Sequence, residues 1–177
     1  MGAGKSSVGR ALGERLNWIF EDLDDRIERR QGRSVPEIFR VSGESGFRRA
    51  EHRALRDVLQ ELRSGGRIIA LGGGAFVQEN NAALLKQAGV PTIFLDATVE
   101  ELWRRCCTQA QEAGAERPLL GGAEQFRKLY EKRRRRYGRA WLTVSTSRRT
   151  VDEIAAEIAQ TLGLKAIAIR VEQGEVE

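Results

Sequence analysis

The first seven residues constrain this chain most strongly. They read Met1-Gly-Ala-Gly-Lys-Ser-Ser7, and Gly4, Lys5 and Ser6 match the last three positions of the phosphate-binding pattern G-x-x-x-x-G-K-[ST]. In such a loop, backbone N–H groups surround phosphate oxygens, the lysine adds a charge, and the serine hydroxyl reaches a bound Mg²⁺. The first glycine of the pattern would fall two residues before Met1. The printed sequence therefore begins inside its own P-loop motif.

Composition bounds the class of protein. A chain of 177 residues fits one domain with one core, and 41% apolar with 31% charged residues is ordinary for a soluble protein and too polar for a membrane span. The net charge of +5 suits anionic small molecules as well as nucleic acid. No signal segment precedes the glycines, and the two cysteines, Cys106 and Cys107, are adjacent, so we expect a cytoplasmic protein without a membrane partner.

Helical and strand patterns alternate along the chain. Apolar periodicity predicts a helix over 5–16, growing out of the phosphate loop. Short apolar runs predict strands at 18–20, 67–71, 92–95 and 142–144. Further helices are predicted at 26–30, 45–62, 80–88, 99–111, 125–139 and 151–162, with Ser34 as the cap of another. This alternation predicts a three-layer α/β fold in which helices cover both faces of a central parallel sheet.

Polar or glycine-rich segments follow two of these strands, where open α/β sheets place their ligands. If the first strand continues, Asp22 and Asp24 point to the same side and can hold Mg²⁺ and orient a hydroxyl group. An equally good interpretation makes these aspartates helix caps. The glycines Gly72, Gly73 and Gly74 follow a buried strand, where backbone can approach a ligand without side-chain bulk. A plain loop is the alternative.

Three arginine segments could serve an anionic ligand. Arg48 precedes or begins a helix, and its planar guanidinium can pair with a carboxylate through two hydrogen bonds. Arg117 lies in a glycine- and proline-bearing loop over 113–123, from which it could close over a nucleotide. Four arginines at 133–136 spread around one helix, so only one or two can face a single site. Taken singly, each is more commonly solvated surface. His52 has no partner nearby in sequence and receives no catalytic role.

Together and in this order, the motifs resemble those of the shikimate kinase family. The resemblance covers about residues 1–162. It rests on the following segments: Met1 to Ser6, Phe20 to Asp24 with Ile27 and Glu28, Gly46 to Arg48 with Glu51, Gly72 to Gly74, Arg117 to Leu120, and Arg133 to Tyr137. The family is a P-loop small-metabolite kinase family. It implies ATP-dependent phosphorylation of the shikimate 3-hydroxyl group in aromatic amino-acid biosynthesis.

The resemblance also implies a role for each motif residue. ATP would be bound by Gly2, Ala3, Gly4, Lys5, Ser6, Ser7 and Arg117, and Mg²⁺ by Ser6 and Asp22. Shikimate would be bound by Asp24, Arg48, Gly72, Gly73, Gly74 and Arg133. Lys5, Asp24 and Arg117 would act in catalysis, with Asp24 as the base and Arg117 swinging over the phosphates. Assigning Arg133 rather than Arg134 to shikimate depends on the register in which the motif is aligned along this helix. A monomer without nucleic-acid partners is expected.

The chain departs from the family at both ends. In the family a strand precedes the P-loop and lies in the middle of the sheet, and this first strand is missing here. Either the true start of the protein lies upstream of Met1, or another segment fills the place of this strand. We expect a kinase domain over 1–163 and a tail over 164–177, either an extra strand or disordered. Within the tail, Lys165 to Val171 alternates like a strand and is the one internal candidate for the vacant place.

Three other functions stay open. One is another small-metabolite P-loop kinase, such as a gluconate-kinase-like protein, although that does not account for the Gly-Phe-Arg and triple-glycine motifs. A second is a truncated, catalytically impaired nucleotide-binding module. A third makes the arginine-rich helix a nucleic-acid contact, which predicts steeply salt-dependent binding. The aromatic residues expected for stacking on single strands are few, so this function ranks last.

Overall fold

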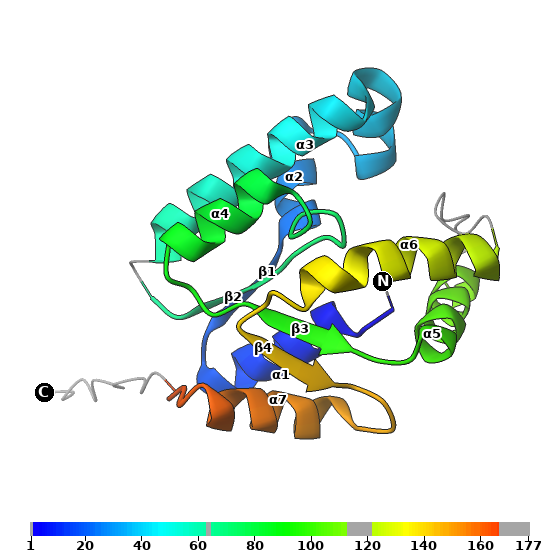
Figure 1. The fold of residues 1–177 in the computed structure, drawn as a ribbon. Coiled ribbons are helices and arrows are strands. Elements are labelled where there is room, and N and C mark those ends of the chain that lie inside the picture. The colour runs from blue at the N-terminus through cyan, green and yellow to red at the C-terminus, as the bar shows by residue number, and fades with distance from the viewer. Residues whose placement is uncertain (1, 63–64, 113–121, 167–177) are drawn as a thin grey trace, which may run out of the picture.

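The computed structural model describes residues 2–62, 65–112 and 122–166. Within them it has four strands and seven helices, which alternate as the sequence predicts (Figure 1). Their order is α1 (Lys5–Leu16), β1 (Ile19–Asp22), α2 (Leu23–Gln31), α3 (Val35–Glu61), β2 (Arg67–Ala70), α4 (Glu79–Gln87), β3 (Ile93–Asp96), α5 (Val99–Glu112), α6 (Ala123–Tyr137), β4 (Leu142–Ser145) and α7 (Val151–Thr161). The α/β class is therefore confirmed.

One local expectation needs correction, and two others are confirmed. The first strand ends at Asp22, whose side chain caps α2, so Asp24 stands in the first turn of a helix and not on a continuing strand. The two helices expected on either side of residue 43 are confirmed, because the α3 span is interrupted at Gly43, whose φ of 65° and ψ of −179° are not helical. The cap at Ser34 is confirmed, because Ser34 and Glu37 form a reciprocal capping box.

The strands form two parallel pairs. In one pair β1 lies beside β2, with Ile19 opposite Arg67 and Asp22 opposite Ala70. In the other β3 lies beside β4, with Ile93 opposite Leu142. Among the described residues no strand pairing joins β2 to β3. A cavity of about 430 Å³ lies between these two strands, so the sheet has two halves with a space in its middle.

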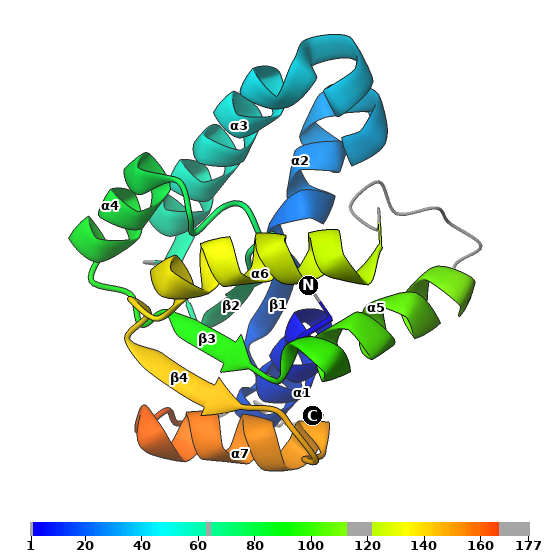
Figure 2. The same ribbon diagram turned by 45° about the vertical axis from the view of Figure 1, so that its right-hand side comes forward.

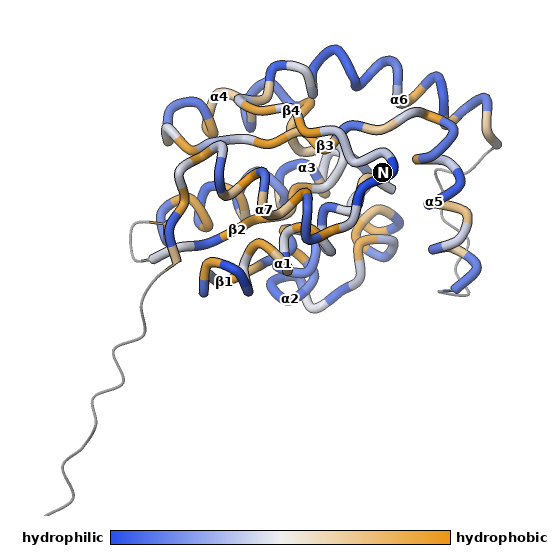
Figure 3. The backbone as a smooth tube through the Cα atoms, turned by 90° about the horizontal axis from the view of Figure 1, so that it is seen from below, coloured by the Kyte–Doolittle hydropathy of each residue, from blue (hydrophilic) through white to orange (hydrophobic). Residues whose placement is uncertain are grey.

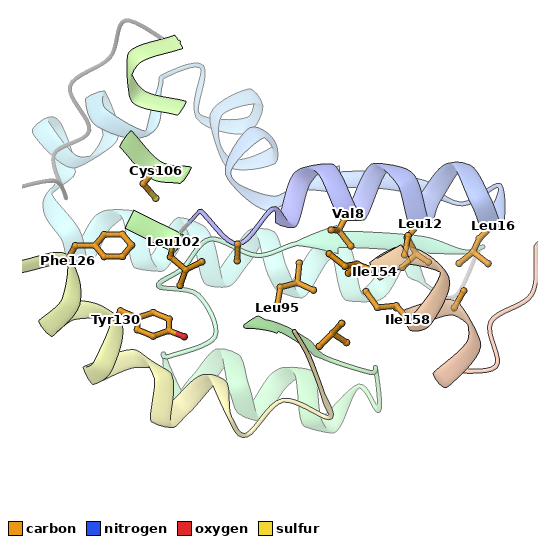
Figure 4. Close-up of a cluster of buried hydrophobic side chains, with 14 residues drawn as sticks. Val8, Leu12, Leu16, Leu95, Leu102, Cys106, Phe126, Tyr130, Ile154 and Ile158 are labelled. Carbon is orange, nitrogen blue, oxygen red and sulfur yellow. The ribbon is translucent and has the colours of Figure 1, made fainter. Parts of the chain in front are cut away.

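Helices cover both faces of the divided sheet, as Figures 1 and 2 show. On one face α1 packs against α7. Figure 4 shows Val8 and Leu12 of α1 turned toward Ile154 and Ile158 of α7, with Leu95 of β3 beside them. On the other face a second core joins α2, α3 and α4; its fully buried members are Leu23, Ile27, Ile38, Phe47, Ala54, Leu55, Ala75 and Leu85.

The hydropathy pattern follows these layers. In Figure 3 apolar colour concentrates on the strands and on the inner sides of the helices, while α6 is mostly hydrophilic. Within the described part of the chain, no helix combines the length and apolar character needed to cross a bilayer.

Candidate active site

The N-terminus of α1 is built to receive an anion. Gly4 precedes the helix with φ 81°, a left-handed conformation that favours glycine. No side chain caps the helix, and its first turn contains no acidic residue. The first amides of α1 are therefore left without side-chain acceptors, and the helix dipole adds positive potential at the same place. These are the properties that the phosphate-loop motif predicts.

Asp22 connects this loop to the end of β1. The Ser6 hydroxyl donates a hydrogen bond to Asp22 Oδ2 at 3.2 Å. The other oxygen, Oδ1, accepts from the backbone N–H of Asp24 at 3.0 Å and so caps α2. The cap interpretation of Asp22 is thus confirmed, and it leaves Oδ2 beside Ser6, so it does not exclude a metal-binding role. A hydroxyl and a carboxylate oxygen side by side are a donor set that fits Mg²⁺, which binds proteins through few carboxylates and otherwise through phosphate and water.

Asp24 has an unusual environment. It is half-buried, and its Oδ1 has no hydrogen-bond partner among the described residues. Burial raises the pKa of Asp24, and the nearby carboxylate of Asp22 raises this pKa further, while the charge of Lys5 opposes both. A carboxylate with a raised pKa and a free oxygen is suited to accept a proton from a bound group.

The triple glycine, Gly72 to Gly74, lies directly against the side chains of Asp24 and Arg48. A Cβ atom at Gly72 would lie 3.0 Å from Asp24 Oδ1, and one at Gly74 would lie 2.5 Å from the guanidinium nitrogens of Arg48. Larger residues would collide with the side chains beneath. The Gly73 carbonyl accepts a hydrogen bond from the Tyr137 hydroxyl, which fixes the loop from α6. The glycines are therefore explained by the close approach of Asp24 and Arg48.

Arg48 is held by a buried acid. Its Nη1 donates to both carboxylate oxygens of Glu51 at 3.0 Å, and the Glu51 side chain is 1% exposed. Burial raises the pKa of Glu51, while the charges of Arg48 and Arg133 lower it. Arg133 also interacts with the Tyr137 hydroxyl. Two guanidinium groups from different helices, those of Arg48 and Arg133, thus lie near Glu51.

The neighbouring arginine of α6 has a different partner. Arg134 Nη2 donates to Asp96 Oδ2 at 2.8 Å, at the end of β3. Asp96 also accepts from the Tyr130 hydroxyl, and burial with this hydrogen bond raises the pKa of Tyr130 to about 12. The helix therefore turns Arg133 toward Glu51 and Arg134 toward β3. Arg117, the lid arginine of the sequence analysis, lies outside the described residues.

Several supporting residues escaped the sequence analysis. Asn81 is buried and donates to the Ala75 carbonyl at 3.1 Å, while its Oδ1 contacts His52 Nδ1 at 2.7 Å. This chain of contacts fixes the segment that follows the triple glycine. Asp96 was missed in the same way, and Tyr137 was named only as part of a family motif without a role, because each acts through a partner more than 30 residues away.

Comparisons with known proteins agree with this geometry. The sequence model of the family described as shikimate kinase matches residues 1–163. The chain belongs to the shikimate kinase family. Members of this family are kinases of the shikimate pathway, and they bind ATP through a P-loop of the kind seen at the start of α1.

Relatives and solved structures of the family resemble the chain over most of its length. It is 39% identical to a shikimate kinase of Geobacter metallireducens, over 89% of this chain and 85% of the relative. It is 40% identical to that of Thermus thermophilus, over 92% and 85%. The shikimate kinase of Acinetobacter baumannii in complex with shikimate superposes with a TM-score of 0.80 at 34% identity, covering 92% of this chain and 88% of that one. The enzyme from Bacteroides thetaiotaomicron also gives 0.80, at 30% identity over 93% and 94%.

Proposed function

We propose that this chain transfers the γ-phosphoryl group of ATP to the 3-hydroxyl group of shikimate. The observation that carries the proposal is that Asp24 and Arg48 lie against the triple glycine, with Lys5 near enough to lower the pKa of Asp24 and Arg133 near enough to lower that of Glu51. A carboxylate and two guanidiniums facing a phosphate loop suit a substrate that is both an alcohol and a carboxylate. Shikimate is such a substrate.

The nucleotide half of the site would use the N-terminus of α1. The amides of Gly2 to Ser7 would surround the β- and γ-phosphates, and the Lys5 ammonium would neutralise part of their charge. Ser6 and Asp22 would hold Mg²⁺, which when bound offsets negative charge on the phosphate oxygens. Arg117, which lies outside the described residues, would contact the phosphates.

The substrate half would use the opposite wall. Arg48 and Arg133 would bind the shikimate carboxylate, and backbone groups of Gly72 to Gly74 would lie along the ring. Glu51 would keep Arg48 in place through its two hydrogen bonds. Anchoring the carboxylate at one end presents the hydroxyl group to Asp24 at the other, and such positioning is the main contribution a protein makes to phosphoryl transfer.

Asp24 would act as the base. As the 3-hydroxyl oxygen forms its bond to the γ-phosphorus, the bond between that phosphorus and the β,γ-bridging oxygen breaks, and ADP leaves. The hydroxyl proton passes to Asp24 Oδ1, the atom without a partner. The raised pKa of Asp24 brings its proton affinity closer to that required at neutral pH.

A substrate panel tests the proposal. ADP release is measured with shikimate, with gluconate and without an acceptor, at saturating ATP and Mg²⁺. We expect ADP release with shikimate, but not with gluconate or without an acceptor. The ³¹P NMR spectrum of the product should show a phosphate monoester. ADP release with gluconate and not with shikimate would contradict the proposal and favour a gluconate-kinase-like protein. ATP binding without turnover on either acceptor would favour the nucleotide-binding module.

We also infer that the enzyme works as a cytoplasmic monomer without nucleic-acid partners. Every residue assigned a role above comes from one copy of the chain. Light scattering at micromolar concentration tests the monomer. Binding of a labelled oligonucleotide at low salt would contradict the assignment of the α6 arginines to shikimate and to Asp96.

A further inference from the structure

His52 is the only histidine of the chain, and the reaction proposed for the chain gives it no role. It lies on α3, where Arg48 stands one helical turn before it on the same face. Its Nδ1 atom contacts Asn81 Oδ1 of α4 at 2.7 Å. Figures 1 and 2 show α4 lying along α3, so this contact joins the two helices close to the substrate half of the site.

The side-chain amide of Asn81 can have only one orientation. Asn81 is 1% exposed, so its polar atoms depend on partners inside the protein. Its Nδ2 donates to the Ala75 carbonyl at 3.1 Å, and a carbonyl oxygen can only accept. Turning the amide over would place two oxygen atoms against each other at this contact. Oδ1 therefore faces His52, and it needs a proton from the histidine ring.

This requirement fixes the tautomer of His52. A neutral imidazole carries its proton on either Nδ1 or Nε2, and the hydrogen bonds of the ring decide between them. In water the Nε2–H form is preferred, whereas the Asn81 oxygen accepts only from an Nδ1–H group. His52 therefore donates from Nδ1 to Asn81 Oδ1, in its neutral form as well as in its charged form.

Asn81 passes this restraint to the triple glycine. The carbonyl that accepts from Asn81 belongs to Ala75, the residue directly after Gly74. The Ala75 amide donates to the Gly72 carbonyl at 3.0 Å, which closes a turn over 72–75. Ala75 is fully buried, so this end of the turn is enclosed by the core. The position of the turn is thus fixed from α4, and the position of the Asn81 side chain is fixed from α3.

We propose that His52 is a positioning residue for shikimate. Through Asn81 it sets where the turn over 72–75 lies relative to Arg48. Arg48 and His52 belong to one helix, so a single rigid element carries both the group for the shikimate carboxylate and the anchor of the backbone along the ring. The spacing of these two contacts is then set before shikimate binds, which reduces the entropy cost of binding. This role rests on the proposed function, whereas the tautomer and the anchored turn do not depend on it.

Nitrogen NMR of the ring tests the tautomer without any ligand. A tag-free chain labelled with ¹⁵N-histidine gives one pair of ring nitrogen signals, because His52 is the only histidine. At about pH 8.5, above the usual titration range of histidine, we expect the proton on Nδ1. Asn81→Ala removes the acceptor and should move the proton to Nε2. A proton on Nε2 in the wild type would overturn the proposal. Nδ1–H in both proteins would also overturn it, because Asn81 would then not decide the tautomer.

Amide hydrogen exchange tests the link to the glycine turn. His52→Leu removes the donor at similar side-chain size, and the Ala75 amide should then exchange about tenfold faster, because the buried Asn81 loses its ring partner. His52→Asn keeps a donor near the place of Nδ1 and should retain most of the protection. Arg53→Leu, at the next position and on the exposed side of α3, is the matched control and should leave the exchange unchanged. Equal exchange in His52→Leu and the wild type would contradict the proposal.

Steady-state kinetics tests the effect on shikimate. We expect His52→Leu to raise KM for shikimate by about fivefold to tenfold, with kcat and KM for ATP within about twofold of wild type. His52→Asn and Arg53→Leu should both stay near wild type. Equal rises in both KM values would show a general loss of structure and overturn the positioning role. A wild-type chain that does not phosphorylate shikimate would refute the proposed function itself, and the NMR and exchange results would still decide whether His52 holds the turn.

Discussion

The Arg48 guanidinium donates through one nitrogen to both oxygens of the buried Glu51 carboxylate, at 3.0 Å each. This pair explains how an arginine on a helix can serve as a fixed anion receptor. A second acid, Glu44, also contacts Arg48 at 3.2 Å, but its side chain is 69% exposed. The two acids therefore differ in burial while sharing a partner, which makes them a matched pair for mutation.

We expect Glu51→Gln to raise KM for shikimate by about tenfold or more, because Arg48 loses its charged buried partner. KM for ATP should change little, since Glu51 lies on the substrate side. Glu44→Gln is the control, and its effect should be within about twofold because an exposed ion pair contributes little. Steady-state kinetics with each substrate varied provides the measurement. Equal effects of the two variants would show that Glu51 does not position Arg48.

Asp24→Asn should lower kcat by at least about 100-fold, because the base is lost. It should also raise Tm at neutral pH. The folded-state pKa of Asp24 is raised, so ionised Asp24 destabilises the fold at pH values above that pKa, and the cost disappears as pH falls below the unfolded value. The gain in Tm should therefore shrink on acidification. A variant that is inactive but not stabilised at pH 7 would contradict the environment described for Asp24.

The same raised pKa predicts the acid limb of the rate profile. Activity requires ionised Asp24, so kcat/KM should fall at a higher pH than a solvent-exposed aspartate would give. The measurement is a pH profile with shikimate below KM. A profile that stays flat down to the ordinary aspartate pKa would assign the base elsewhere.

Gly74→Ala should weaken shikimate binding, since its Cβ would lie 2.5 Å from the Arg48 guanidinium and displace it. We expect KM for shikimate to rise by about tenfold, with a smaller change in KM for ATP. Gly138→Ala is the control: its φ is −63° and its nearest neighbour to a Cβ is 3.6 Å away. This control should be neutral or slightly stabilising.

Arg133→Ala and Arg134→Ala should separate substrate binding from structure. Arg133 faces Glu51 and Tyr137, so its loss should raise KM for shikimate by about tenfold or more. Arg134 pairs with Asp96 and is 58% exposed, so its loss should cost at most about 1 kcal/mol of stability and leave KM near wild type. Reversed effects would mean that α6 binds the substrate in the other register.

The sequence predicted the order of elements and most of their bounds, because apolar periodicity and caps are local signals. The helix at Lys5 to Leu16 was predicted to the residue. Sequence patterns could not predict which residues far apart in the chain form hydrogen bonds with each other. The hydrogen bond of Tyr137 to Gly73 spans 64 positions, and that of Tyr130 to Asp96 spans 34. No local pattern carries such pairings.

Local competition explains the remaining differences. Asp22 ends β1 and also caps α2, because its carboxylate accepts from the Asp24 amide, so the strand does not continue to Asp24. The break at Gly43 separates two helices within the α3 span, and its φ of 65° lies in the region that favours glycine. The roles assigned to Lys5, Asp24, Arg48 and Arg133 remain predictions, although the structure brings these side chains to one site.

A crystal structure of the chain with shikimate and ADP tests the central claim most directly. The account predicts the shikimate carboxylate between Arg48 and Arg133, the ring along Gly72 to Gly74, and the 3-hydroxyl group within hydrogen-bonding distance of Asp24. Shikimate bound elsewhere, or bound with its carboxylate away from both arginines, would contradict it.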